Sequence, residues 1–152
     1  MAATHPWDQV THDLREEMHD LAHFSTVDAY RQGRATLWVT LTVLPLLWGL
    51  DMMTGFITDS YEGYVAVWAD NVLPGDAGDA VLWVGAITVL AGLLVAAAPH
   101  FGGDVLGVWF VLLAIDLFGV DEMAHLGIGM LALALCSFAM ARMVRGDHRR
   151  EA

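Results

Sequence analysis

Five ionisable residues in or beside strongly apolar segments are the first candidates for chemistry in this sequence. They are Asp51, Asp116, Asp121, Glu122 and His125. An acid at the centre of an apolar membrane span costs roughly 2.5–3.5 kcal/mol on insertion scales, so such acids are candidates for function. Carboxylate oxygens with one imidazole suit a cation site or a proton relay. The alternative is that these residues cap helices and are solvated at a membrane surface.

A second candidate cluster lies near the N-terminus. His12, Glu16, His19 and His23 are spaced by four, three and four residues, which places them on one face of a predicted helix. Imidazoles one turn apart can share a metal ion or respond to pH. Asp20 stands where the His-Glu-x-x-His motif of zinc proteases has its glutamate base, so a protease is not expected. The alternative is a solvated polar face or one that contacts a partner.

The positions of the basic residues predict the elements that hold these candidate residues. Between Arg34 and Arg142 there is no lysine or arginine, although this interval holds most of the apolar residues. Spanning helices retain arginine and lysine on the cytoplasmic side, so both termini are expected in the cytoplasm after an even number of spans. The cell membrane is the expected location.

The apolar segments predict an all-α, four-transmembrane-helix bundle, because each is long enough, or nearly so, to cross about 30 Å of hydrocarbon. The predicted spans are 35–57, 80–98, 105–120 and 124–144. The domain organisation is then a cytoplasmic helix and linker (1–34), a membrane domain (35–145) with an outer loop (58–79), and a cytoplasmic tail (146–152).

Two flanking segments are predicted to be amphipathic. Within residues 7–24, apolar side chains recur at a 3.6-residue period, which indicates a cytoplasmic helix lying on the membrane or on a partner. In the outer loop, Tyr61, Tyr64 and Trp68 recur at helical spacing, so a short helix flat on the outer leaflet is expected. An irregular loop is the competing interpretation.

Small residues predict where the spans pack, because they let membrane helices approach closely. One stripe runs along the second span and another along the fourth. The predicted packing residues are Gly85, Gly92, Ala96, Gly129, Ala132, Cys136 and Ala139. Pro45 is expected to kink the first span, with Thr40 or Thr42 compensating its missing donor. Pro99 with Gly102-Gly103 predicts a tight inner turn.

The first span aligns with the third, so that Leu46–Asp51 matches Val111–Asp116 and an acid lies at the same depth in both. This favours two repeated helical hairpins, with chance similarity between apolar segments as the alternative. The run Leu44-Pro45-Leu46-Leu47-Trp48 resembles the signature of small multi-span proteins built from SPW repeats, and the resemblance covers residues 35–144. It implies residence in a membrane without implying a reaction.

Composition narrows the function further. The chain is 57% hydrophobic, with a formal net charge of −11, which argues against nucleic acid as a partner. The expected function is a non-enzymatic accessory or structural subunit of a membrane complex. Its expected partners are the lipid bilayer and other membrane subunits or further copies of this chain; no cofactor is indicated. The alternatives are a small ion or proton carrier that uses Asp51 and Asp116, and a metal- or redox-binding subunit.

Overall fold

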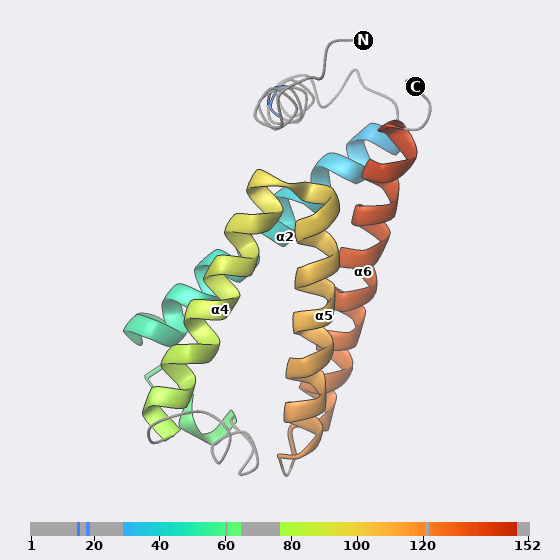
Figure 1. Ribbon diagram of the computed structural model, residues 1–152. Coiled ribbons are helices and arrows are strands. Elements are labelled where there is room, and N and C mark those ends of the chain that lie inside the picture. Colours follow the sequence, from blue (N-terminus) through green and yellow to red (C-terminus); the bar gives the residue numbers. More distant parts are fainter. Residues whose placement is uncertain are drawn as a thin grey trace.

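The computed structural model describes Arg15, Met18 and residues 29–59, 61–64, 77–120 and 122–148. Within these ranges there is no strand, and the fold is built from α2 (Ala29–Thr54), a 3-10 helix η1 (Glu62–Tyr64), α4 (Ala77–Ala97), α5 (Pro99–Phe118) and α6 (Ala124–His148) (Figure 1). The four α-helices are long and apolar enough to cross a membrane. The predicted all-α bundle of four spans is therefore confirmed. Apart from Arg15 and Met18, the predicted helix over 7–24 lies outside the described residues.

Both described ends of the helical bundle lie at the same end of the molecule. The Tyr30 hydroxyl, in the first turn of α2, donates a hydrogen bond to the Met143 carbonyl of α6 at 3.1 Å. The guanidinium of Arg145 in α6 pairs with the Asp104 carboxylate of α5 at 2.6 Å. We call this the terminal end; the opposite end, where α2 stops and α4 and α6 begin, is the loop end. The even number of crossings follows from this arrangement.

The connection between α4 and α5 is shorter than predicted. Ala98 alone separates the two helices, and α5 already begins at Pro99. The prediction that Gly102 and Gly103 belong to the turn is therefore wrong, since both lie inside α5 and are buried. A Cβ on Gly102 would lie 2.5 Å from the Leu94 carbonyl, so glycine is required where α5 folds back against α4.

The helices pair as two hairpins, α2 with α4 and α5 with α6, which join through contacts between α4 and α5. Figure 1 shows the two pairs close together at the terminal end and diverging towards the loop end. The largest fully buried side chains include Leu41, Val95, Leu106, Phe110 and Met140. These residues belong to one core cluster, to which all four helices contribute. The core therefore lies towards the terminal end, and the loop-end half is less tightly closed.

Two indole N–H groups in the bundle find hydrogen-bond acceptors on neighbouring helices. The Trp38 indole N–H of α2 donates to the Val95 carbonyl of α4 at 3.3 Å. The Trp109 indole N–H of α5 donates to the buried Thr88 hydroxyl of α4 at 2.9 Å, and that hydroxyl donates to the Val84 carbonyl at 2.7 Å. In the apolar interior of a membrane bundle, polar groups must find their hydrogen-bond partners within the protein. These bonds therefore fix the register of α4 against α2 and α5.

The predicted small-residue stripe on α4 lies in the α2–α4 contact. Gly85 is buried against α2, and a Cβ there would lie 2.9 Å from the Gly49 carbonyl oxygen. Gly92 is buried beside Pro45, which itself is buried inside α2, and Ala96 is half-buried. Thr42 does not compensate Pro45 as expected, because its buried hydroxyl has no partner among the described residues.

The predicted stripe on α6 faces away from the other described helices, which is a correction. Gly129, Ala132, Cys136 and Ala139 are all exposed. The buried side of α6 instead carries Phe138 and Met140, whose side chains fill the space over Gly107 and Gly103 of α5. The same side of α6 also carries the buried small residues Gly127, Ala134 and Ala141, so both helices supply small residues to this contact, on a different side of α6 from the predicted one.

Candidate functional site

The end of α2 is closed by a buried acid that the sequence marked as a candidate cation ligand. Asp51 is 5% exposed. One of its carboxylate oxygens accepts the Ile57 amide at 2.5 Å and the Thr58 amide at 3.3 Å, and the other accepts the Tyr61 hydroxyl at 2.5 Å. We call this set the Asp51 clasp. It folds the chain after α2 back onto the helix that precedes it.

The sequence produces the clasp through an ordinary helix ending. Gly55 has a φ of +62°, and its amide donates to the Asp51 carbonyl at 2.7 Å. This left-handed conformation favours glycine and reverses the chain direction after Thr54. The following amides then point back at the carboxylate, which receives three donors in place of the water it loses by burial.

Tyr61 is held in its neutral form by the same arrangement. Burial raises the pKa of its hydroxyl above the ordinary 10.0, and the hydrogen bond to Asp51 raises this pKa further, against smaller opposing effects of the Thr58 and Trp48 side chains. A hydroxyl that stays protonated remains a donor, so the Asp51 carboxylate keeps its partner across the physiological pH range. Asp51 is thereby a structural acceptor rather than an open ligand.

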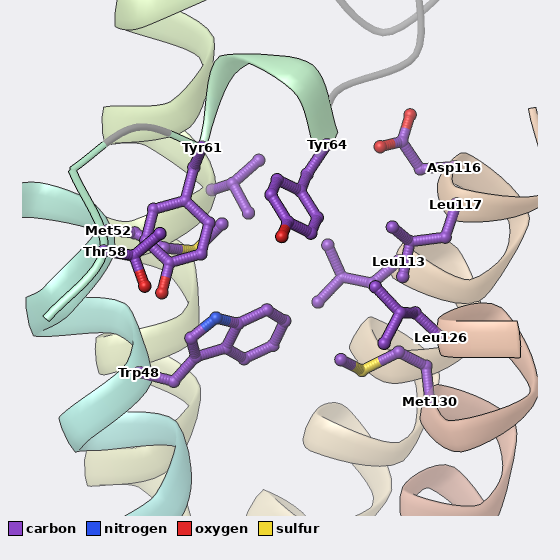
Figure 2. A pocket seen from close by; sticks show the side chains of 11 residues that line it. Trp48, Met52, Thr58, Tyr61, Tyr64, Leu113, Asp116, Leu117, Leu126 and Met130 are labelled. Atoms are coloured by element: carbon purple, nitrogen blue, oxygen red, sulfur yellow. The ribbon is translucent and has the colours of Figure 1, made fainter. Parts of the chain in front are cut away.

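Beside the clasp, a cleft of about 300 Å³ separates the two hairpins at the loop end. Figure 2 shows side chains of α2 and of the segment after it on one side and those of α5 and α6 on the other. The lining residues are Trp48, Met52, Thr58, Tyr61, Tyr64, Val84, Leu113, Asp116, Leu117, Leu126 and Met130. The cleft forms because the two hairpins diverge towards the loop end and their side chains do not fill the space between them.

The two walls of the cleft differ in chemistry. Trp48, Tyr61 and Tyr64 give the first wall three aromatic rings, and the two tyrosine rings lie 5.6 Å apart at 54°. The opposite wall is aliphatic, apart from a carboxylate, that of Asp116, which lies towards Tyr64 (Figure 2). The result is a mostly apolar space whose lining residues carry one acid, the Thr58 and tyrosine hydroxyls and the Trp48 indole nitrogen as polar groups.

The described members of the predicted cation site are not brought together. Asp51 is closed inside the clasp, whereas Asp116 faces the cleft from the other hairpin. Glu122 and His125 are exposed, and the His125 Nδ1 lies 2.9 Å from the Glu122 carbonyl oxygen in the turn before α6. Asp121 lies outside the described residues. In the described part of the chain, no three His, Cys, Asp or Glu side chains are placed to hold a metal ion.

Two other predictions concern segments that are partly or wholly outside the described residues. His12, Glu16, His19 and His23 all lie outside, and so does Trp68 of the outer loop. Tyr61 precedes the 3-10 turn η1 and Tyr64 is its last residue, and the rings of both line the cleft. The clasp draws Tyr61 towards α2.

Sequence reasoning missed both the clasp and the cleft. The signal for the helix end was present, since Gly55 directly follows the last residue of α2 and glycine is typical of this capping position. No such signal marked Asp51 as the acceptor for the chain that follows. The cleft left no comparable signal, because its residues come from four helices and a loop and no local pattern connects them.

Comparisons of this chain with models of protein families, with curated proteins and with solved structures find no match.

Proposed function

We propose that this integral membrane protein is a non-enzymatic accessory or structural subunit that associates with another membrane chain through the outward face of α6. The other chain is a different subunit or a second copy of this one. The observation that carries the proposal is the unpartnered stripe of small residues on that face, formed by Gly129, Ala132, Cys136 and Ala139.

Within the bundle, several glycines lie at close contacts between helices. Gly49 and Gly85 face each other between α2 and α4, and Gly103 lies against α6. A Cβ on Gly129, by contrast, would meet nothing within 4 Å. Lipid does not require small side chains, whereas a partner helix does, so the α6 stripe supports a helix–helix contact outside the described chain.

The single cysteine provides a direct test, because Cys136 is exposed in the middle of this stripe. A maleimide photocrosslinker attached to Cys136 in native membranes should capture a discrete polypeptide, identified by mass spectrometry. The matched control is Cys136→Ser combined with Leu90→Cys, which places the probe on an exposed position of α4. Equal capture from both positions, or a clean monomer in mild detergent with no crosslinked chain, would contradict the proposal.

We further propose that the terminal end faces the cytoplasm of a cell membrane. Arg31, Arg34, Arg142 and Arg145 all belong to the terminal end, and the interval between Arg34 and Arg142 contains no basic residue. This asymmetry supports cytoplasmic termini. Reporter fusions at both ends should give the cytoplasmic signal, and an opposite signal from either fusion would reject the orientation.

A carrier remains the second candidate function, favoured by the position of Asp116 in the cleft. The Asp51 clasp argues against a carrier that uses Asp51 and Asp116 together, because the Asp51 carboxylate already accepts three hydrogen bonds. In liposomes, Asp116→Asn should abolish a cation flux and Asp51→Asn should impair it only through folding. Absence of flux in the wild-type protein would remove this candidate.

A further inference from the structure

The cleft between the hairpins has the composition of a site for an organic cation. Trp48, Tyr61 and Tyr64 present rings along one wall, and ring faces attract cations through their quadrupole. Asp116 adds a carboxylate on the facing wall. Aromatic rings that converge with one acid are the usual means by which proteins recognise ammonium groups.

The distribution of charged residues at the loop end also favours a cationic ligand. The loop end is built from the interval between Arg34 and Arg142, which has no lysine or arginine, and it carries Asp59, Asp79 and Glu122 besides the two acids already described. A cleft lined by one sign of charge concentrates ligands of the opposite sign. An anion would meet repulsion there without a lysine or arginine from this interval to offset it.

The remaining walls select for an apolar tail. Leu113, Leu117, Leu126 and Met130 form the side provided by α5 and α6, and Met52 lies on the opposite side (Figure 2). The volume of about 300 Å³ is at the small end of the range for small-molecule sites, which fits a short-chain compound better than the body of a two-chain lipid.

We propose that this cleft binds a small amphiphilic ammonium compound, a quaternary or protonated amine with a short apolar tail. The ammonium group lies between the aromatic wall and Asp116, and the tail lies against the aliphatic wall. Tyr61 is oriented for this by the Asp51 clasp, which holds its hydroxyl away from the ligand. The site is independent of the lateral contact proposed for α6.

The test uses the full chain in phosphatidylglycerol nanodiscs and three soluble probes with equal tails: hexyltrimethylammonium, hexanol and hexanesulfonate. Isothermal titration, with empty discs as the blank, should show saturable binding of the ammonium probe. The neutral alcohol should bind at least about tenfold more weakly, and the sulfonate should not bind. Equal affinity for the three probes, or no binding beyond the empty discs, would overturn the proposal.

Variants locate the site. Asp116→Asn should weaken binding of the ammonium probe by about tenfold, whereas Asp79→Asn, which removes an exposed loop-end carboxylate that does not line the cleft, should leave it unchanged. Trp48→Leu should weaken it by about fivefold, with Trp83→Leu on an exposed face of α4 as its control. Equal effects of a cleft variant and its control would refute the assignment.

Two further experiments cover a variant that does not fold and a ligand that is a lipid headgroup. If Asp116→Asn does not fold by circular dichroism, Tyr64→Leu takes its place and should weaken the ammonium probe in the same direction. Repeating the titration in phosphatidylcholine discs distinguishes a soluble ligand from a lipid headgroup. Retained affinity supports the soluble compound, and loss of binding only in these discs would assign the cleft to the choline headgroup and overturn the proposal as stated.

Discussion

Asp51 in the first hairpin and Asp116 in the second hairpin occupy matching positions near the loop end of α2 and α5, but their surroundings differ. After α2 the connection to α4 runs from residue 55 to 76, long enough for its first residues to turn back and donate to the Asp51 carboxylate. After α5 only residues 119–123 precede α6, and Asp116 is left facing the cleft. The longer connection thus allows the chain after α2 to enclose Asp51, whereas Asp116 lines the cleft.

The largest expected effect separates these two acids. Asp51→Ala leaves the Tyr61 hydroxyl and two amides without their acceptor, so we expect a loss of about 3 kcal/mol in the free energy of unfolding. Asp116→Ala removes a carboxylate that lines the cleft and should cost clearly less, about 1 kcal/mol. Unfolding in mixed micelles with increasing dodecyl sulfate, followed by circular dichroism, measures both. Equal losses would show that the two acids are not used differently.

The second prediction compares a closed and an open helix face. Gly49→Ala places a Cβ 2.7 Å from the Gly85 carbonyl oxygen, so we expect a loss of about 2 kcal/mol from overpacking. Gly129→Ala adds the same methyl group where nothing lies within 4 Å, and should be neutral or slightly stabilising in the isolated chain. The same unfolding measurement applies, and a destabilised Gly129→Ala monomer would place the α6 stripe inside the fold.

The third prediction concerns two tyrosines on the same short turn. Tyr61→Phe removes the hydroxyl that donates to Asp51 and should lower the free energy of unfolding by about 1.5 kcal/mol. Tyr64→Phe keeps the ring that lines the cleft and should change this free energy by about 0.5 kcal/mol or less. If the two variants are equally stable, the clasp does not contribute to folding.

The smallest effect is a pH dependence. The pKa of Tyr61 is raised above 10.0 in the folded chain, so between about pH 10 and that raised value the folded state holds more protons than the unfolded state. Its stabilising contribution is therefore fully present below pH 10 and is lost as pH rises through the raised pKa. The tyrosinate absorbance of the wild-type protein minus that of Tyr61→Phe should titrate above pH 10. A difference titration at or below 10 would contradict the buried donor.

The number of helices, and the location of both chain ends at the same end of the bundle, could be predicted from the sequence. The bilayer sets the length of each apolar segment and the side on which its basic flanking residues lie, without reference to the other helices. Which face of α6 turns inward could not, since small residues occur on two of its sides and the choice depends on Gly103 and Gly107 of α5. Asp51 was correctly singled out as unusual, but its role depends on where the amides of Ile57 and Thr58 point. That is a property of the turn and not of residue type.

The single-residue joint at Ala98 has a mechanical consequence. Gly102 packs directly against the Leu94 carbonyl, so α4 and α5 are in close contact at the terminal end, and both helices extend from there as two long arms towards the loop end. Each arm is about 30 Å long, so a rotation of roughly 5° at the joint shifts the far tips by about 2.5 Å. A small change of packing near Ala98 is thus magnified into a larger change of the distance between the helix ends at the loop end.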